Sequence, residues 1–446
     1  MLTPAVAVAG FLAAAFVTAS VPVLVVVALG CGALSGGLLG RAAFALFGLD
    51  RRPALRASAF FSVGLTAAVA VLGAVTVLRP IPTTTAPAPP GVRFWDLPTG
   101  SRIAYVHSPA TGKARPTPVI FLHGGPGTPG EGVPTGGLEL AADDFDVYSC
   151  DQLGAGRSTR LRDVTGYTVA RQVADLEAIR RTLGADRIIL VGQSWGGSLT
   201  AQYLAAHGEH VAKAVFTSTG ALWGRQYPGS KDGEPWTRLS PAQQARLDRL
   251  NSAPRIIAAT LLLQINPAAP HALVDDREVV PWMHEVALQG KDSTSCEDAP
   301  PTTAHDNPQG FYSNQMTVKD FERLPDPRPR LRTLRVPSLI MRGECDFIKP
   351  AVTAEYQHTL AGSELVTVKR AGHSISGEQP GRYTALLRAF LLDKPLPTAT
   401  GRVRSATDQT GGSFPECRRP YSRASDSVRP GDVDDPARSL APYSPS

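Results

Sequence analysis

The chain has 446 residues, which is enough for one large catalytic domain with appended segments, because single α/β domains run to about 250 residues before they divide. Its formal net charge is +6, but the basic residues are scattered and are not interleaved with aromatic side chains, which argues against nucleic-acid binding. The sequence has no repeat of solenoid or propeller period, and its bias towards alanine and arginine is typical of a GC-rich bacterial genome.

The N-terminal segment has the composition of a membrane anchor. Residues 1–40 contain no charged side chain, and residues 57–78 again contain none, so each stretch exceeds the roughly 20 apolar residues that span a bilayer. We therefore predict two transmembrane helices within an anchor of residues 1–79. A cleaved signal peptide is the alternative, but residues 1–8 lack the basic side chains with which such a peptide begins.

The charges between the two helices predict the orientation of the anchor. This loop carries four arginines against one acid, namely Arg41, Arg51, Arg52 and Arg56 against Asp50. Basic loops stay in the cytoplasm, so the chain after Arg79 is expected on the outer side of the cell membrane. Residues 80–91 are rich in proline, threonine and alanine and are expected to form a stiff linker between the anchor and the next domain.

Short apolar runs alternate with helical patterns along the next part of the chain. A hairpin is expected over residues 92–107, around the turn at Thr99 and Gly100. Helices are expected at 169–183 and 199–206. Six further strands are expected at 118–122, 145–150, 187–191, 214–217, 338–341 and 365–368. The alternation predicts an α/β fold with a mostly parallel sheet and helices on both faces.

The alternation is interrupted by a long insertion. Helical patterns at 241–250, 255–263 and 277–288 predict a helical cap over residues 223–330 that covers the strand ends. The core is thereby divided into residues 92–222 and 331–396. Residues 397–446 have little apolar content and are predicted to be a disordered tail.

The segment Gly192-Gln193-Ser194-Trp195-Gly196 is a G-x-S-x-G pattern between an expected strand and an expected helix. This setting is typical of a nucleophile elbow, in which glycines allow a tight, strained turn that exposes the serine. A serine in an ordinary glycine-rich turn is the alternative. The strand before it and the helix after it favour Ser194 as a nucleophile.

A serine hydroxyl needs a base and an orienting carboxylate, which follow the serine in the order acid, then histidine. Asp346 comes after the strand at 338–341, and His373 comes after the strand at 365–368. Both positions lie at the carboxyl ends of sheet strands, where ligands bind in this class of fold. Glu344 is a rival acid, but it lies nearer the strand than the position expected for the acid.

A glycine-rich loop follows the strand at 118–122. In the segment 123–127, which reads His-Gly-Gly-Pro-Gly, the backbone N–H groups can approach a developing oxyanion without obstruction by side chains. We predict that the N–H groups of Gly125 and Trp195 form an oxyanion hole. A loop that only reverses the chain is the alternative reading of these glycines.

Four motifs in order carry a family resemblance: residues 123–127, 151–158, 192–197, and 343–346 with Pro350. Together they resemble the proline iminopeptidase family of α/β-hydrolases, over about residues 92–222 and 331–395. The resemblance implies an enzyme that releases N-terminal residues, often proline, from peptides. It implies triad roles for Ser194, Asp346 and His373, oxyanion roles for Gly125 and Trp195, and a structural role for the loop at 151–158.

The resemblance also implies a role for the cap, which in family members supplies acidic residues that bind the free α-amine of the substrate. The segment 281–285 is similar to the family's W-x-x-W-E segment, so Glu285 is a candidate substrate ligand. Glu297, Asp298 and Asp306 compete with it. Each of these acids also fits a solvated surface position.

Four cysteines follow the anchor. In the usual strand order for this fold, Cys150 and Cys345 lie about 19 Å apart at roughly 4.8 Å per strand, beyond the reach of a disulfide. Cys150 is therefore expected to be a buried free thiol. Cys345 is expected to pair with Cys296 or with Cys417, and a bond between Cys296 and Cys417 is the third possibility. No Cys/His spacing resembles a zinc site, so we expect no metal.

The expected function is acyl transfer from a small peptide or ester substrate without a cofactor. One alternative is a carboxylesterase of the same fold. An alternative of another class is a non-catalytic membrane sensor that uses the fold only to bind a ligand. The sequence indicates no protein partner.

Overall fold

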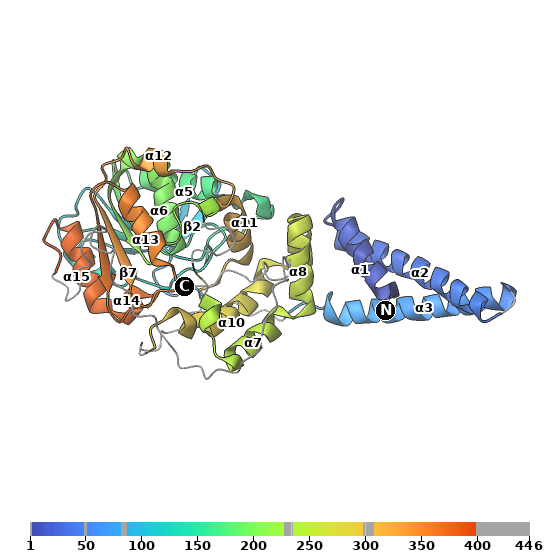
Figure 1. Ribbon diagram of the computed structural model, residues 1–446. Coiled ribbons are helices and arrows are strands. Elements are labelled where there is room, and N and C mark those ends of the chain that lie inside the picture. The colour runs from blue at the N-terminus through green and yellow to red at the C-terminus, as the bar shows by residue number, and fades with distance from the viewer. Residues whose placement is uncertain are drawn as a thin grey trace, which may run out of the picture.

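The computed structural model describes residues 2–48, 51–81, 87–226, 233, 235–297, 299 and 307–397. It consists of a globular part that contains a β-sheet and an elongated part made of N-terminal helices (Figure 1). Helices α7 (Pro241–Asn251), α8 (Pro254–Ile265) and α10 (Asp276–Thr294) of the insertion lie on the side of the globular part that faces the N-terminal helices (Figure 1).

The core is an eight-stranded sheet in the order β1-β2-β4-β3-β5-β6-β7-β8. The strands are β1 (Arg93–Asp96), β2 (Arg102–Ser108), β3 (Val119–Leu122), β4 (Val147–Cys150), β5 (Ile188–Gln193), β6 (Val211–Thr217), β7 (Ser338–Gly343) and β8 (Ser363–Val368). β1 and β2 form the predicted antiparallel hairpin, and the pairs from β4 to β8 are parallel. The predicted fold class is confirmed.

The central strands β3, β5 and β7 are buried on both faces, as their nearly continuous apolar sequences predict. In β5, Ile188 and Leu190 belong to one apolar cluster, whereas Ile189 and Val191 belong to the other. The first cluster includes side chains of α5 (Val169–Thr182), α6 (Trp195–His207) and α13 (Pro350–Thr359). The second includes side chains of α4 (Gly137–Ala142), α14 (Ile375–Glu378) and α15 (Pro380–Leu391). The central strand that carries Ser194 is therefore held from both sides.

The insertion between β6 and β7 is helical, as predicted. It contains η3 (Gly224–Gln226), η4 (Pro235–Arg238), α7 (Pro241–Asn251), α8 (Pro254–Ile265), α9 (Ala268–Leu273), α10 (Asp276–Thr294), α11 (Phe311–Phe321) and α12 (Arg328–Leu331). α7 begins with a capping box in which Ser240 and Gln243 satisfy each other's backbone N–H groups. Two short 3₁₀ turns, η1 (Val164–Gly166) and η2 (Gly208–His210), belong to the core.

The anchor contains three helices: α1 (Leu2–Ala15), α2 (Val21–Leu46) and α3 (Arg51–Thr76). By length and composition, α2 and residues 52–76 of α3 are long and apolar enough to cross a membrane, which agrees with the two predicted spans. The predicted boundary of the first span was wrong, because residues 1–40 contain a break between α1 and α2. Pro22 lies in the first turn of α2, where a missing N–H costs no helical hydrogen bond, and so favours a new helix start there.

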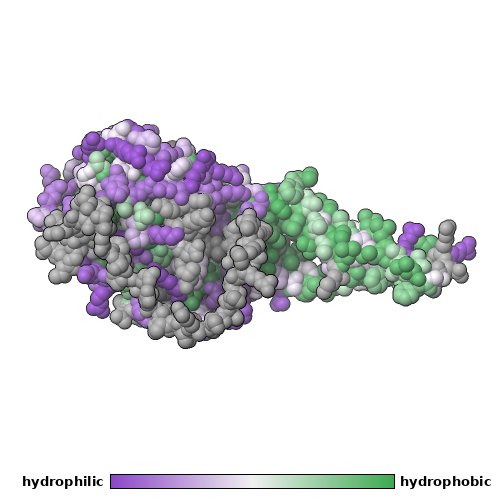
Figure 2. All heavy atoms as spheres, in the orientation of Figure 1, coloured by the Kyte–Doolittle hydropathy of each residue, from purple (hydrophilic) through white to green (hydrophobic). Residues whose placement is uncertain are grey.

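The surface of α2 and α3 is apolar and exposed. Only 22% of the most apolar window of α2 and 6% of that of α3 is buried, whereas the core helix of a soluble protein would be mostly buried. Figure 2 shows this hydrophobic surface along the helices, in contrast with the hydrophilic surface of the globular part. Phe60 is 80% exposed and lies in the middle of α3.

The anchor is bound to the cap by polar contacts at three points. The Asn266 side chain donates to the carbonyl of Ala15 over 2.9 Å, and Arg255 donates to the carbonyl of Val77 over 2.6 Å. The backbone N–H of Ile81 donates to Glu278 over 2.7 Å. The start of the predicted linker at 80–91 is therefore attached to the cap and does not hold the cap away from the anchor.

Candidate active site

Ser194 lies in a sharp turn between β5 and α6. Its backbone has φ +52° and ψ −117°, a conformation that residues other than glycine rarely adopt. The turn is held by the N–H of Ser194, which donates to Thr217 on the adjacent strand, and by its carbonyl, which accepts from the N–H of Gly220, both at 3.0 Å. The predicted strand–turn–helix setting of the G-x-S-x-G pattern is present.

The glycines of the pattern are required by close packing. A Cβ at Gly192 would overlap the carbonyl of Gly196, and a Cβ at Gly196 would overlap the carbonyl of Leu122 at the end of β3. The turn can therefore approach the neighbouring strand only if these positions lack side chains.

Asp346 and His373 form a buried pair at the carboxyl ends of β7 and β8. Nδ1 of His373 and Oδ1 of Asp346 are 2.8 Å apart, and their side chains are 1% and 0% exposed. Donation from Nδ1–H leaves Nε2 with the lone pair that a general base needs. Nε2 has no hydrogen-bond partner among the described residues, Ser194 included. Such bonds are often long in unliganded enzymes and shorten when substrate binds.

The charge of Asp346 is maintained in a buried site. Burial opposes ionisation, but the charge and hydrogen bond of His373, the charge of Arg342 and the N–H of Ile348 together hold the pKa of Asp346 below its usual value. Glu344, the rival acid, is exposed and accepts a hydrogen bond from the N–H of Arg370. The structure thus brings Asp346 to the histidine and directs Glu344 to the surface.

The loop that carries His373 is bound to the end of cap helix α10. The N–H of His373 donates to the carbonyl of Thr294 over 2.8 Å. Glu378 is 4% exposed and accepts from the N–H groups of Gly372, at 2.9 Å, and Cys296, at 3.2 Å. Sequence reasoning missed Glu378, because an acid five residues after the histidine matches no motif. Its role depends on the cap segment that folds against it.

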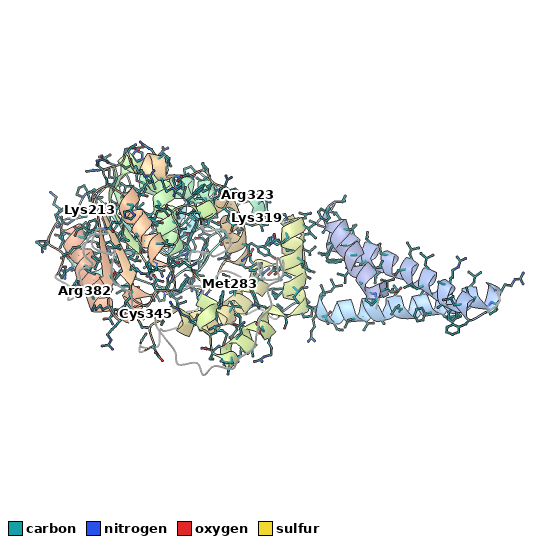
Figure 3. All side chains as sticks on the ribbon, viewed as in Figure 1. Lys213, Met283, Lys319, Arg323, Cys345 and Arg382 are labelled. Atoms are coloured by element: carbon teal, nitrogen blue, oxygen red, sulfur yellow. A yellow bond between two sulfur atoms is a disulfide. The ribbon has the colours of Figure 1, made fainter. Side chains whose placement is uncertain are left out.

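A disulfide joins the cap to the loop of the acid. Cys296 and Cys345 are bonded, with Cα atoms 5.3 Å apart, so the structure selects one of the pairings left open by the sequence. Cys345 lies at the edge of the core beside the cap (Figure 3). Cys150 is a buried free thiol, as predicted, and burial raises its pKa to about 12. Cys417 lies outside the described residues.

The candidate oxyanion loop contains Gly125 in a conformation that favours glycine. Its φ is +108°, and a Cβ there would lie 2.6 Å from the backbone nitrogen of Gly127 and 2.7 Å from that of Thr128. Trp195 is the first residue of α6, so its N–H has no acceptor within the helix. Both backbone positions are thus compatible with donation to a ligand.

Gln152 connects the two segments that carry these N–H groups. Its backbone N–H donates to Nε2 of His123 over 2.9 Å, and its side-chain amide donates to the His123 carbonyl over 2.8 Å. Its side-chain oxygen accepts from the indole N–H of Trp195 over 3.0 Å. The Gln152 amide is therefore a positioning group between the loop at 123–127 and the start of α6. From its sequence, the loop at 151–158, which contains Gln152, was expected to have only a structural role.

The rest of the loop at 151–158 is attached to the segment around Asn307. Asp151 accepts from the N–H of Arg157 and from the side chain of Asn307, both at 2.9 Å. Burial raises the pKa of Asp151 to about 6.

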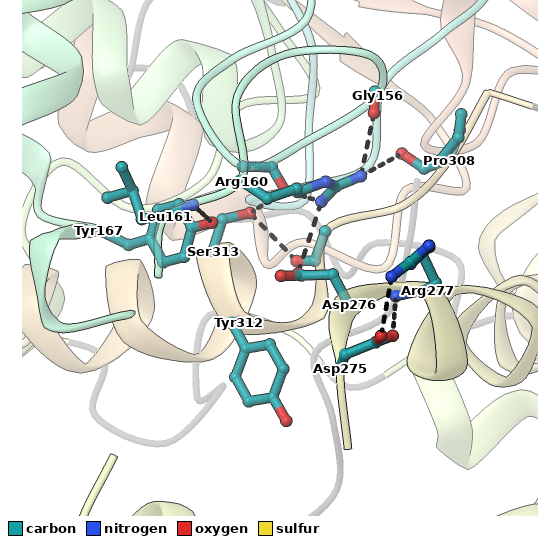
Figure 4. A network of polar contacts seen from close by, with 12 residues as sticks. Gly156, Arg160, Leu161, Tyr167, Asp275, Asp276, Arg277, Pro308, Tyr312 and Ser313 are labelled. Carbon is teal, nitrogen blue, oxygen red and sulfur yellow. Dashed lines mark hydrogen bonds and ion pairs between the residues drawn. The ribbon is translucent and has the colours of Figure 1, made fainter. Parts of the chain in front are cut away.

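Arg160 extends the polar contacts of this loop to the cap (Figure 4). Its guanidinium donates to the carbonyls of Gly154, Gly156 and Pro308 and lies 4.0 Å from Asp276, at the start of α10. Both ends of α10 thus contact loops of the core.

The substrate-binding candidates are not brought to the triad by any described contact. Glu285 lies on an exposed position of α10, and no hydrogen bond or ion pair of the described residues includes its side chain. Glu297 is also exposed, and Asp298 and Asp306 lie outside the described residues. Trp282 is buried, and its indole N–H donates to the carbonyl of Leu250 over 3.1 Å.

One group among the described residues has ligand atoms close enough for a metal ion: Glu177, His207 and His210, within 4.8 Å of one another. The Glu177 carboxylate already accepts from Arg180 and Arg181 over 2.7 and 2.9 Å. The positive charge of these arginines opposes a cation, so we assign no metal site to this group.

The chain is similar to known proteins of the alpha/beta hydrolase fold. Residues 117–380 match the family model of the alpha/beta hydrolase fold. The chain is 26% identical to a proline iminopeptidase of Heyndrickxia coagulans over 306 residues, which are 66% of this chain and 96% of the relative. A proline iminopeptidase of Levilactobacillus brevis is 28% identical, over 62% of this chain and 88% of the relative.

Among solved structures, a proline iminopeptidase of Mycobacterium smegmatis has 20% identity and a TM-score of 0.45, and the match covers 68% of this chain and 98% of that one. The sequence relatives confirm the resemblance stated above, and the family model covers more than half of the chain, including the described residues of the cap. The protein is therefore a member of the α/β-hydrolase fold family.

Proposed function

We propose that this hydrolase uses Ser194 as a nucleophile and forms an acyl-enzyme. The observation that carries the proposal is the buried Asp346–His373 pair, which lies at the same sheet edge as the strained turn of Ser194. A purely structural pair would need neither an Nε2 without a partner nor a serine with positive φ at the same ends of the parallel strands.

The mechanism follows from these groups. Nε2 of His373 takes the proton of the Ser194 hydroxyl as its oxygen attacks the substrate carbonyl, and Asp346 orients the ring and stabilises its charge. The N–H groups of Gly125 and Trp195 stabilise the tetrahedral oxyanion. His373 then protonates the leaving group, and water, activated by the same nitrogen, releases the acyl group.

We infer that the substrate is a peptide from which one N-terminal residue is removed. Support comes from the relatives named proline iminopeptidase, in which the matched segment makes up about nine-tenths of their length. The cap would then contact the free α-amine, with Glu285 as the candidate ligand. The exposed position of Glu285 favours a second candidate, a carboxylesterase, because an ester substrate needs no acidic partner for an amine.

We also propose that α2 and α3 anchor the enzyme in the cell membrane with the catalytic part outside. Both helices have the length of a span and an exposed apolar surface, and the arginines at their joint favour a cytoplasmic location of that joint. Reporter fusions test the orientation. A fusion after Leu78 should report export, and a fusion near Arg52 should report the cytoplasm; cytoplasmic activity of a full-length fusion would contradict the proposal.

A substrate panel separates the functions. The purified full chain is assayed with proline anilide, N-acetyl-proline anilide and short acyl esters, with the Ser194→Ala variant as the control. An aminopeptidase cleaves the free anilide and rejects the acetylated one, whereas an esterase prefers the acyl esters. No Ser194-dependent turnover of any of them would favour the non-catalytic sensor.

A further inference from the structure

A cavity of about 330 Å³ lies between the anchor and the cap, and we call it the anchor–cap cavity. Its walls come from α1, α2, the second half of α3 with the residues that follow it, and α8 of the cap. Every lining residue is apolar. The four helices contribute, in this order, Phe11, Leu29, Gly73 and Leu261 among others. The size is within the range of small-ligand pockets, which begins near 300 Å³.

The walls of this cavity are held in place by polar contacts at both ends of α8. At its start, the buried Arg255 pairs with the buried Glu278 at 2.8 Å and donates to the carbonyl of Val77, just after α3. After its end, Asn266 donates to the carbonyl of Ala15 at the end of α1. The cavity is therefore a defined feature of the fold, because the helices that form it are bound to each other on two sides.

The chemistry of the walls selects the occupant. The cavity is open on one side, and its walls offer apolar side chains, so their contact with water is unfavourable. The walls formed by α2 and α3 belong to the two helices that have membrane-spanning length, and the hydrophobic surface continues along them (Figure 2). In a bilayer, the apolar groups next to such helices are the hydrocarbon chains of lipids.

We propose that the anchor–cap cavity binds one acyl chain of a membrane lipid. This inference rests on the proposal that α2 and α3 cross a membrane. Leu261 and Ile257 of α8 would contact the chain from the cap side, and Ile257 is 43% exposed although it is apolar. The lipid would thus contact the anchor and the cap at once and seat the cap at the membrane surface.

Two glycines of α3 provide a matched test. A Cβ at Gly73 or at Gly64 would meet no atom within 4 Å, so both positions accept a larger side chain without a clash at the Cβ. Gly73 lines the cavity, whereas Gly64 is an exposed residue of the same helix and does not line it. Gly73→Phe therefore places a ring at the cavity wall and reduces its volume, and Gly64→Phe adds the same ring elsewhere on the apolar surface.

The full chain and both variants are reconstituted in phosphatidylcholine vesicles that contain a lipid with a photoactivatable acyl chain, and labelled peptides are mapped. We expect labelling of the 254–265 peptide in the wild type and in Gly64→Phe, and its loss in Gly73→Phe. Labelling of α3 at exposed positions such as Phe60 should persist in all three proteins. An intact Cys296–Cys345 bond and an unchanged elution volume in detergent serve as checks of folding.

The outcomes are separable. Recovery of the wild-type chain in the soluble fraction, before any labelling, would overturn the membrane anchor and the lipid site together. Membrane insertion with equal labelling of the 254–265 peptide in all three proteins would overturn only the acyl-chain site. Crosslinked dimers in the wild type that disappear in Gly73→Phe would assign the cavity to a second copy of the chain and would also overturn it.

Discussion

Two buried polar pairs, one beside Ser194 and one at the junction of the anchor and the cap, join different parts of this molecule. Asp346 and His373 come from neighbouring strand ends and are 27 residues apart in the chain. Arg255 and Glu278 come from two cap helices, and with Ile81, which is 197 residues from Glu278, they attach the cap to the anchor. In the proposed mechanism the first pair serves chemistry at the carboxyl ends of the strands, whereas the second pair holds the cap against the anchor.

Cap helix α10 connects these two regions. Glu278, in its first turn, belongs to the anchor junction, and Thr294, at its end, accepts the N–H of His373. Since a helix rises 1.5 Å per residue, the two positions are about 24 Å apart. The cap is thus attached at both ends of α10, to the anchor and to the loop of His373. Changes beside His373 should mainly alter activity, whereas changes at the anchor junction should mainly alter stability.

The largest expected effect is on turnover, from a substitution at the carboxyl ends of the strands. Ser194→Ala should lower kcat by about a millionfold, the typical cost of losing a triad nucleophile, while the melting temperature stays close to that of the wild type. Turnover of an active substrate and a thermal melt of the same sample measure both. Labelling of this variant by a fluorophosphonate would contradict the assignment of the nucleophile.

The second prediction concerns the stability of the junction between the anchor and the cap. Arg255→Met should lower the free energy of unfolding by about 3–5 kcal/mol, because it leaves the Glu278 charge buried without its partner. The double variant Arg255→Met with Glu278→Leu should recover part of that loss. Denaturant melts of the detergent-solubilised chain measure the free energy of unfolding of each variant. Equal stability of the single and double variants would show that the pair is not coupled.

The disulfide tests the link between cap and acid loop. The Cys296–Cys345 bond joins residues 49 apart in the chain. By restricting the unfolded chain, a loop of this length should stabilise the folded state by about 4 kcal/mol. Cys296→Ser and Cys345→Ser should therefore lower the melting temperature by similar amounts, with Cys150→Ser as the control of an unpaired thiol. Non-reducing peptide mapping checks the pairing. A peptide that joins Cys345 to Cys417 would be incompatible with the structure.

The smallest effect concerns pH. The folded-state pKa of Asp151, about 6, lies above the ordinary 3.8, so the folded state binds more protons than the unfolded state between these values. The contribution of Asp151 to stability should therefore fall as pH rises from about 4 to 6, by at most about 3 kcal/mol, since one pKa unit corresponds to about 1.4 kcal/mol. Asp346, whose pKa is lowered, should lose its contribution as pH falls below 4.

Melting temperatures of the wild type and of Asp151→Asn between pH 4 and 7 separate the contribution of Asp151 from that of Asp346. Relative to the variant, the wild type should become less stable as pH rises through this range. A constant difference between the two proteins would contradict the raised pKa of Asp151.

Much of the fold and the candidate site was predictable because it depends on local patterns. Continuous apolar runs predicted the strands, since a strand buried on both faces needs apolar side chains throughout. The glycines at 192 and 196 predicted the turn at Ser194, since no other residue fits beside the carbonyls of Leu122 and Gly196. The positions of Asp346 and His373 after their strands predicted their meeting, because parallel strands end at one edge.

Other features were decided by the tertiary structure. Cys296 and Cys417 are equivalent as partners of Cys345 in the sequence, and only the course of the chain after α10 places Cys296 beside it. The contacts of Glu378, Gln152 and the Arg255–Glu278 pair likewise join segments that are distant in the chain. Hydrogen bonds and ion pairs of this kind have no periodicity, so a buried polar residue becomes recognisable only when its partner is in place.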